Sequence, residues 1–290
     1  MSLNCRFVSL TISIVAITLY IIYRTASQYG EYRIQSALRD YQAKIGLLKR
    51  DRETNLRRLQ VYSWRWQTVR EDRELMSRRL NEAIKELNQF KCTVQENVTE
   101  SGAWCRWPFE HKHFTDNGLA AFLAKMMEGM SVGSFGEGPG RYKSYLVQSG
   151  LVPTYDAYDG SPWIENATNY EVKYLDLTVP HYGLPIYDWV LSIEVAEHIP
   201  RRYEEVYLGN LARHAKGGLV LSWAVPGQTG FGHVNARPSE YVEAKLKLLC
   251  FDKNVNRTNQ MRRSADLIWL RKNIAVYERR QDCSLVPEDA

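Results

Sequence analysis

At residues 130–140 the chain reads MSVGSFGEGPG, the most informative segment of the sequence for its architecture. Its first half is short and apolar, as a buried strand is, and its second half is a glycine-rich turn. The residues Arg141–Ser149 that follow are typical of a helix. A turn of this kind brings backbone close to a ligand at the carboxyl end of a strand. The stretch therefore predicts an α/β sheet with a ligand site at Gly136, Gly138 and Gly140.

Strand and helix patterns alternate along the rest of this part of the chain. Further strands are expected at Pro153–Tyr158, Glu171–Leu177, Tyr187–Ile193, Gly218–Trp223, Leu267–Leu270 and Ile274–Glu278. Helices are expected between them, notably at Arg202–His214 and Pro238–Leu248. Strands that recur between helices favour a doubly wound, mostly parallel sheet covered on both faces. We expect seven strands.

Two acidic residues follow predicted strands at positions that suit a nucleoside ligand. Asp159 comes 19 residues after Gly140 and ends the second strand. A carboxylate has only hydrogen-bond acceptors, so it can accept hydrogen bonds from both hydroxyls of a ribose. Asp156, one strand alternation earlier, is the competing candidate for that role. Asp176 ends the third strand, where an acid could accept the adenine amino group.

These motifs, taken in order, resemble those of class I S-adenosylmethionine-dependent methyltransferases. SFGEGPG at residues 134–140, Asp159, YDWVLSIEVAEHI at 187–199 and GGLVLSW at 217–223 look like motifs I, II, IV and post-IV of that family, over roughly residues 119–278. GHVN at 232–235 resembles metazoan methyltransferase-like proteins. The resemblance implies S-adenosylmethionine as cofactor, bound by the following residues: Ser134, Gly136, Gly138, Gly140, Asp159, Asp176 and Glu194. The family usually has an acid at the position of Ser134, where it organises water near the methionine moiety.

The sharpest signal for mechanism is EVAEH at residues 194–198, at the end of the fourth strand. Such ExxEH sequences resemble those of small-RNA 2′-O-methyltransferases and ubiquinone-biosynthesis O-methyltransferases, where they hold a divalent metal. The resemblance implies Glu194, Glu197, His198 and His233 as ligands of Mg²⁺, Mn²⁺ or Zn²⁺. Without a metal, His198 or His233 would act as the general base. The catalytic residues are then Glu197, His198 and His233.

The remaining histidines are expected at the surface. They are His181, His214 and the histidines of the patch Glu110–His113.

The N-terminus carries a hydrophobic run of 17 uncharged residues, at positions 7–23. That length is at the short end of what spans a bilayer as a helix. We interpret residues 1–6 as a cytosolic tail and 7–24 as a membrane anchor of a single-pass type II protein. A cleavable signal peptide is the alternative, because Thr25, Ala26 and Ser27 resemble a cleavage site.

Features after this run favour a catalytic domain in the secretory lumen, in the Golgi or endoplasmic reticulum. Four of the five cysteines follow it, Cys92, Cys105, Cys250 and Cys283, an even number that suits two disulfides of open pairing. Glycosylation sequons lie at Asn97, Asn166 and Asn256. Four free thiols in a cytosolic domain remain the alternative.

Residues 25–95 predict a helical stem that separates the anchor from a domain at 96–290. Residues 28–91 contain no proline and show a seven-residue repeat. One set of repeat positions includes Leu38, Leu59, Trp66, Leu80 and Leu87. The second set lies four residues before each position of the first. The pattern indicates a self-associating coiled coil. A helix folded back on the domain is the alternative.

The net charge of +5 would suggest an anionic partner if it were spread evenly, but its distribution along the chain argues against nucleic acid as a partner of the domain. Residues 28–95 contain 15 Lys and Arg against 9 Asp and Glu, a net charge of +6. Residues 96–290 contain 21 against 24, a net charge of −3. The basic character therefore lies outside the domain that would bind phosphates.

The layout is that of Golgi enzymes that modify glycans, and it predicts an O-methyltransferase acting on a hydroxyl of a glycan or polar small molecule. One alternative is a catalytically inactive scaffold acting through its coiled coil, which Ser134 favours. The other is an RNA 2′-O-methyltransferase, which shares the ExxEH sequence but conflicts with the acidic domain and the anchor.

Overall fold

The computed structural model describes residues 31–94, 97–105 and 113–283, with side chains from residue 38 onward. The chain divides into two compact units, Met1–Arg70 and Glu71–Ala290. The predicted tail and membrane anchor at residues 1–24 lie outside the described residues. Among the helices that are described, none is long and apolar enough to cross a membrane.

A single helix, α2 (Glu31–Val94), occupies the predicted stem. In the first unit its apolar repeat positions are exposed, and Trp66 has 68% of its surface accessible. The other exposed members of the repeat there are Leu38, Tyr41, Ile45, Leu48, Leu59, Tyr62 and Val69. An apolar stripe of this length on one helix leaves a large hydrophobic surface in contact with water.

The second unit is built on a seven-stranded mixed sheet with strand order β3-β2-β1-β4-β5-β7-β6. The strands are β1 (Ser131–Phe135), β2 (Thr154–Asp159), β3 (Lys173–Tyr174), β4 (Tyr187–Ser192), β5 (Ala215–Ser222), β6 (Phe251–Lys253) and β7 (Ile274–Arg279). β1 to β5 run parallel, and β7 is antiparallel to both β5 and β6. The predicted fold class, a mostly parallel seven-stranded α/β sheet, is confirmed.

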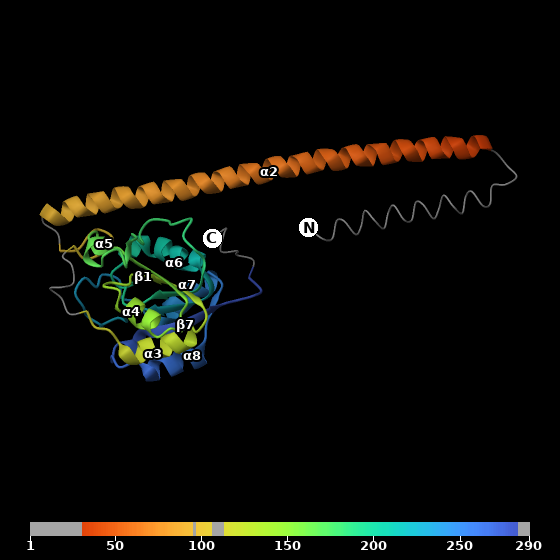
Figure 1. Ribbon diagram of the computed structural model, residues 1–290. Helices are drawn as coiled ribbons and strands as arrows, with labels where there is room; N and C mark the ends of the chain where they lie inside the picture. Colours follow the sequence, from red (N-terminus) through yellow and green to blue (C-terminus); the bar gives the residue numbers. More distant parts are fainter. Residues whose placement is uncertain (1–30, 95–96, 106–112, 284–290) are drawn as a thin grey trace. The chain divides into compact units, whose positions relative to one another are not determined.

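Helices cover both faces of the sheet, as Figure 1 shows. One core packs α3 (Asn117–Met126), α4 (Arg141–Gln148) and α8 (Val255–Ser264) against residues such as Trp189 and Leu191. The other packs α6 (Glu204–His214) and α7 (Ser239–Leu248) against residues such as Val190. Because side chains alternate along a strand, consecutive residues of β4 feed opposite cores. The remaining helices are α5 (Ile164–Ala167), η1 (Arg201–Tyr203) and α9 (Leu270–Asn273).

At the C-terminal end one strand prediction is wrong and one strand was not predicted. Leu267–Leu270 is not a strand, because it forms the connection between α8 and the start of α9. Its apolar character comes from Leu270, which is buried in a core, and from Leu267 and Trp269, which pack against that core. The sixth strand is β6, whose three residues include only one buried side chain, so no alternating pattern marks it in the sequence.

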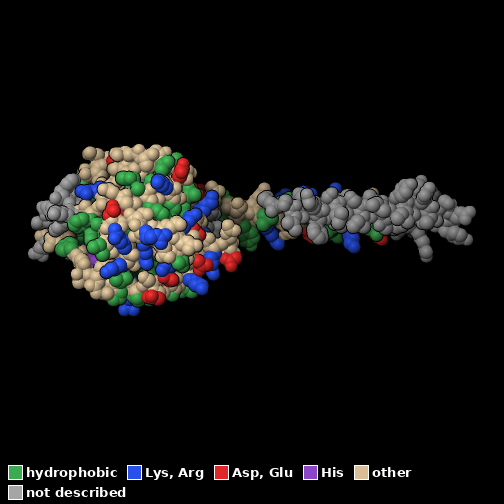
Figure 2. All heavy atoms as spheres, turned by 90° about the horizontal axis from the view of Figure 1, so that it is seen from below, with side chains coloured by type: hydrophobic (Ala, Val, Ile, Leu, Met, Phe, Trp, Pro, Cys, Tyr) green, Lys and Arg blue, Asp and Glu red, His purple; other side chains and the backbone are tan. Residues whose placement is uncertain are grey.

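Positive charge gathers on one face of the second unit. Figure 2 shows Lys and Arg side chains clustered where α3 and α8 lie in Figure 1. Arg262 and Arg263 stand in the last turn of α8, and Arg271 and Lys272 in α9. Cations at the end of a helix interact favourably with its dipole. Residues 96–290, whose net charge is −3, thus still form a locally basic surface.

The last turns of α2 belong to the second unit and contact it directly. Ser77, Asn81 and Asn88 are buried there. The Tyr182 ring lies between the guanidinium groups of Arg73, at 4.1 Å, and Arg213, at 4.2 Å. Residues 71–94 therefore pack on the domain, so the sequence-based alternative of a helix against the domain describes this part of α2.

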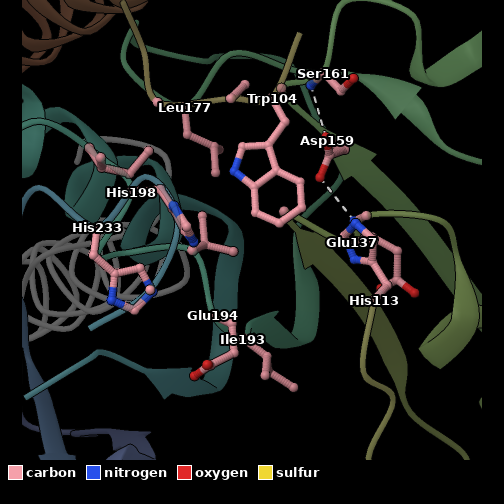
Figure 3. Close-up of a pocket in the computed structure, with 18 of the residues that line it drawn as sticks. Trp104, His113, Glu137, Asp159, Ser161, Leu177, Ile193, Glu194, His198 and His233 are labelled. Atoms are coloured by element: carbon pink, nitrogen blue, oxygen red, sulfur yellow. Dashed lines mark hydrogen bonds between the residues drawn. The ribbon is translucent and has the colours of Figure 1, made fainter. Parts of the chain in front are cut away.

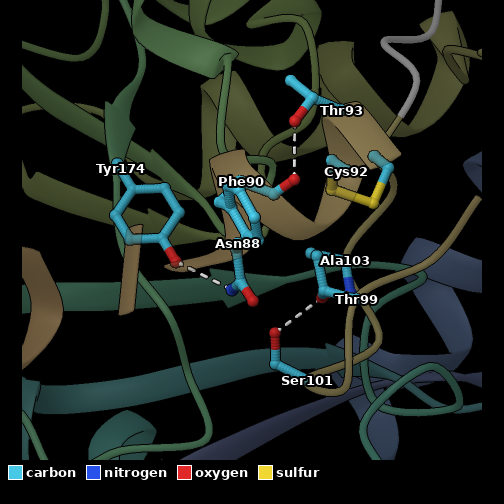
Figure 4. The surroundings of a disulfide bond; sticks show 9 residues. Asn88, Phe90, Cys92, Thr93, Thr99, Ser101, Ala103 and Tyr174 are labelled. Carbon is cyan, nitrogen blue, oxygen red and sulfur yellow. Dashed lines mark hydrogen bonds between the residues drawn. A yellow bond between two sulfur atoms is a disulfide. The ribbon is translucent and has the colours of Figure 1, made fainter. Parts of the chain in front are cut away.

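All four cysteines that follow the hydrophobic run are paired. Cys92, at the end of α2, bonds to Cys105 with a Cα–Cα distance of 5.1 Å (Figure 4), and Cys250 bonds to Cys283 at 5.9 Å. The first bridge fastens the loop at residues 97–105 to the helix. The second fastens the residues after β7 to the turn before β6.

Candidate active site

The glycine-rich turn joins β1 to α4 in backbone conformations that favour glycine. Gly136, Gly138 and Gly140 have φ values of 90°, 64° and 79°. A Cβ on Gly136 would lie 2.2 Å from a methyl carbon of Val195, so no side chain fits there. The N–H of Gly136 donates to the Tyr158 carbonyl at 2.8 Å, which ties the turn to the end of β2. The turn therefore leaves its backbone open at the carboxyl end of β1.

Asp159 is fixed at the end of β2 beside this turn. Its Oδ2 accepts the N–H of Gly138 at 2.9 Å and its Oδ1 accepts the N–H of Ser161 at 2.8 Å, as Figure 3 shows. Burial raises the pKa of the Asp159 carboxyl, against the effect of these two donors. Asp156, the competing candidate, instead accepts the Tyr187 hydroxyl at 2.9 Å and does not line the cavity.

A cavity of about 490 Å³ lies at the carboxyl ends of the strands. The predicted site residues that line it are Ser134, Gly136, Gly138, Asp159, Asp176, Glu194, His198 and His233. Gly140 and Glu197 do not line the cavity. Gly140 is the N-cap of α4, and Glu197 is fully buried. The glycine turn, the acids of β2 and β3 and the histidines thus share one cavity.

Glu137 supplies an acid beside Ser134, the position where the resemblance implies an acid and this chain has a serine. Its buried carboxylate accepts the N–H of Lys143 and the hydroxyl of Tyr155, both at 2.8 Å, and bonds to the Ser134 side chain. Burial raises the pKa of Glu137. Because Glu137 stands between two glycines of the turn, its inward direction could not be seen in the sequence pattern.

Glu194 is held in a strained conformation where β4 ends. Its φ of 58° is uncommon for a residue other than glycine, and such outliers gather at functional sites. Its Oε1 accepts the Ser222 hydroxyl at 2.8 Å and the Asn273 amide at 3.0 Å. Burial raises the pKa of its carboxyl. Ser222 ends β5 and Asn273 ends α9, so Glu194 is held at the carboxyl end of the neighbouring strand.

Glu197, His198 and His233 form a compact group beside the cavity. One ligand atom of each lies within 4.8 Å of the others. Glu197 is 0% exposed, and neither of its carboxylate oxygens has a hydrogen-bond partner. Burial, helped by the charge of Glu194, raises the pKa of Glu197. A buried carboxylate without partners is costly, and two imidazoles beside it complete the kind of donor set that binds a divalent cation.

Glu194 stands outside this group, so the structure brings together three of the four predicted metal ligands.

Backbone hydrogen bonds bring His233 to this group. The N–H groups of Val234 and Asn235 donate to the Glu197 carbonyl at 2.9 and 3.0 Å. Nδ1 of His198 bonds to the Gly232 carbonyl at 3.2 Å, and Nδ1 of His233 to the Gln228 carbonyl at 3.2 Å. A carbonyl accepts only from a protonated nitrogen, so both imidazoles keep Nε2 as the basic atom.

Burial, with the nearby His233, lowers the pKa of His198 to about 4, which leaves it neutral at pH 7.

Trp104, which the motifs did not indicate, lies across the cavity (Figure 3). Its ring centroid is 5.8 Å from that of His198, 5.7 Å from Phe231 and 5.2 Å from His113. Trp104 precedes Cys105, so the Cys92–Cys105 bridge holds it in place. A tryptophan next to a cysteine that closes a short loop was the available sequence signal.

The expectation that His181 and His214 lie at the surface is wrong. Both are buried, at 3% and 2% exposed. Nε2 of His181 bonds to the Asp176 carbonyl at 2.6 Å, and Nε2 of His214 to the His181 carbonyl at 3.3 Å. His214 is the last residue of α6 and His181 lies in the segment after β3, where backbone groups need partners. His113 lines the cavity, and residues 110–112 lie outside the described residues.

Comparison with known proteins returned similarity in structure only. No protein-family model matches the sequence, and neither does any curated protein. The magnesium protoporphyrin IX methyltransferase of Synechocystis PCC 6803, solved with bound SAH, is 16% identical, with a TM-score of 0.43 over 57% of this chain and 81% of its own.

Two sugar-modifying enzymes are similar at the same level. The amino pentose methyltransferase CalS10 of Micromonospora echinaspora, solved with SAM, is 11% identical with a TM-score of 0.44, over 56% of this chain and 90% of its own. The sugar N-methyltransferase KedS8 of Streptoalloteichus sp ATCC 53650 is 15% identical with a TM-score of 0.45, over 57% and 88%. The α/β architecture of the second unit is given by its own strand order, with β1 to β5 parallel and β7 antiparallel.

Proposed function

We propose that this protein is an S-adenosylmethionine-dependent methyltransferase that methylates a hydroxyl group. One observation carries the proposal. The buried, unpartnered carboxylate of Glu197 lies with His198 and His233 beside the same cavity that the glycine turn and Asp159 line. A group that can take a proton from an acceptor thus adjoins the surface that a nucleoside cofactor would occupy.

The cofactor assignment rests on the cavity's two acids and its open backbone. Asp159 would accept the ribose hydroxyls, and Asp176 the adenine amino group. The turn at Gly136 and Gly138 would let the methionine part approach closely. Glu137 takes over the role of the acid missing at Ser134, since its carboxylate bonds to that serine.

The methyl transfer is an in-line displacement, in which the bond from carbon to sulfonium sulfur breaks as the bond from carbon to acceptor oxygen forms. The hydroxyl proton has to leave. Nε2 of His198 or His233 can accept it, because the carbonyl bond of each ring is made by Nδ1. Glu197, His198 and His233 would hold a divalent cation if one is bound, and such a cation lowers the pKa of a hydroxyl that it contacts.

As the acceptor we propose a glycan or another polar small molecule. Trp104 and Phe231 form an aromatic wall next to His198, and Phe231 is 51% exposed. Apolar faces of sugar rings pack on aromatic side chains, while their hydroxyls reach polar groups nearby. The adjacent imidazoles supply those polar groups.

Several features support a lumenal location for the domain. Both disulfides suit an oxidising compartment. The three sequon asparagines, Asn97, Asn166 and Asn256, are all exposed and thus accessible to glycosylation. The hydrophobic run at residues 7–23 would anchor the chain. Digestion of the cellular protein with an endoglycosidase checks this: a faster band is expected, and an unchanged band would place the domain elsewhere.

Self-association through the apolar stripe of α2 is the proposed use of the stem. The stripe continues past the first unit, since Met76 and Phe90 are 67% and 69% exposed although this part of α2 contacts the domain. The helix would therefore present its apolar side to a second copy and its polar side to its own domain.

The substrate proposal is tested by profiling intact glycan masses in cells with and without the gene. Loss of increments of about 14 Da, the mass of a methylene, is expected, because methylation adds one CH₂. An unchanged glycan profile would exclude glycans as acceptors and leave polar small molecules, which the same cells can be profiled for.

A further inference from the structure

Polar side chains on one face of α2 bond to the domain's backbone. Ser77, Asn81 and Asn88 are buried and spaced by four and seven residues, which places them on the same side of the helix. The Ser77 hydroxyl donates to the Pro180 carbonyl at 3.0 Å and accepts the N–H of Tyr182 at 3.1 Å. Because buried polar groups need partners, these bonds dictate how the helix lies on the domain.

Asn81 pairs with the free edge of the sheet. β3 is the outermost strand, and an edge strand leaves backbone groups unpaired. The Asn81 Nδ2 donates to the Tyr174 carbonyl at 3.3 Å, and its Oδ1 accepts the N–H of Asp176 at 3.0 Å. One side-chain amide thus does what a neighbouring strand would do for these two residues.

The residue held in this way is the acid at the end of β3. Asp176 is 1% exposed and lines the cavity. Its Oδ1 accepts the N–H and the hydroxyl of Thr178, at 2.9 and 2.6 Å. Its Oδ2 is buried without any partner. A donor from a ligand in the cavity would satisfy that oxygen.

We propose that Asn81 is a positioning residue of the cofactor site, so that the domain end of the stem helix is required for recognition of adenine. By holding the Asp176 backbone, Asn81 directs the free carboxylate oxygen at the 6-amino group of the base. The role rests on the proposed cofactor. It places part of the cofactor site outside the seven-stranded fold, on a helix that the motifs assign to the stem.

The proposal predicts selectivity between two forms of the base. A carboxylate attracts the 6-amino group of adenine and repels the 6-oxo group of hypoxanthine. S-adenosylhomocysteine and S-inosylhomocysteine differ only at this edge of the base, in the 6-substituent and in the hydrogen that hypoxanthine carries on N1. The ratio of their affinities leaves out contacts shared by both ligands, and its change from the wild type to a variant reports on the Asp176 carboxylate.

The experiment titrates the full chain in detergent with each ligand by calorimetry. We expect the wild type to bind S-adenosylhomocysteine at least about tenfold more tightly than the inosine analogue. Asn81→Ala should reduce that ratio toward 1. The matched control is Asn88→Ala, which also removes a buried amide on the same face of α2, but one that bonds at 3.4 Å to the Tyr174 side-chain hydroxyl. It should keep the wild-type ratio.

A purely structural role for Asn81 would lower affinity for both ligands equally and leave the ratio unchanged, and that result overturns the proposal. If Asn81→Ala does not fold, Asn81→Ser keeps a polar group at the buried position but is too short to reach both backbone partners, and it should reduce the ratio in the same way. A wild type that binds neither ligand would overturn the cofactor assignment itself, which is a different result from a wild-type ratio in the variants.

Discussion

Nε2 of His233 lies 4.0 Å from Oε1 of Glu197, although 36 positions separate the two residues in the sequence. The contact exists because the loop after β5 returns to the turn after β4 and bonds to its backbone at the Glu197 carbonyl. Gly230 leaves the space that the His233 ring fills, since a Cβ there would lie 2.3 Å from Nε2. Single side chains of this group can therefore be removed while backbone bonds keep the others in place.

The first prediction concerns metal binding. The wild type should bind about one Mn²⁺ per chain, and Glu197→Gln or His233→Ala should weaken this at least about tenfold, because each removes a donor from the group. Calorimetric titration with MnCl₂ measures it. Asp159→Asn, an acid of the same cavity outside the group, is the control and should bind Mn²⁺ as the wild type does. Unchanged binding by His233→Ala would remove His233 from the ligand set.

The second prediction concerns methyl transfer. Glu197→Ala and His233→Ala should abolish transfer and leave cofactor binding within about threefold, because neither side chain lies at the glycine turn or at Asp159. Re-expression of each variant in cells that lack the gene checks it: the wild type should restore the methylated products and the variants should not. Restoration by either variant would exclude that residue from the mechanism.

The third prediction concerns Glu204, which anchors the segment after His233. This buried carboxylate, at the first position of α6, accepts hydrogen bonds from Asn235 at 3.1 Å, from Arg237 at 2.9 Å and from Tyr241. Burial raises the pKa of Glu204, but the bonds from Tyr241, Asn235 and Arg237 outweigh burial, so the pKa is lowered. Glu204→Gln should lower the free energy of unfolding by about 3 kcal/mol at pH 7, because it leaves the Arg237 charge unpaired.

The sign of the pH dependence follows from the lowered pKa. Glu204 stabilises the fold above its unfolded pKa of about 4.3, and this contribution is lost as the pH falls through the folded value. The difference between wild type and Glu204→Gln should thus be constant from pH 6 to 8 and shrink below about pH 4. Urea unfolding measures it. Glu205→Gln, the neighbouring exposed carboxylate, should match the wild type, and an equal loss in that control would contradict the anchor role.

Local features of the sequence predicted the fold and the part of the site that lies around the glycine turn, Asp159 and the end of β4. The glycine turn, Asp159 and the strands around them are readable because each lies in a short segment whose pattern belongs to one element. Trp104 lines the cavity because a disulfide holds its loop, and Asn81 bonds to the backbone of a distant strand edge. No local pattern records either contact. His181 and His214 were misplaced because histidine occurs in cores and at surfaces alike, and backbone partners far along the chain decide between them.

The fourth prediction concerns the stem. Leu59→Glu should shift the full chain in detergent toward the monomer, because a charge would enter the apolar stripe of α2. Gln60→Glu introduces the same side chain at the next position, outside the stripe, and should leave the assembly intact. Sedimentation velocity distinguishes the two. A monomeric wild type would contradict self-association through α2.

We claim that the cavity beside the glycine turn and Asp159 binds S-adenosylmethionine, and calorimetric titration of the full chain with S-adenosylhomocysteine measures this binding. The wild type should bind one molecule per chain with a Kd below about 1 mM. Asp159→Ala should lose this binding, whereas Asp156→Asn, the other acid of β2, should retain it. No binding by the wild type, or loss in Asp156→Asn with retention in Asp159→Ala, would contradict the claim and favour a scaffold without catalytic activity.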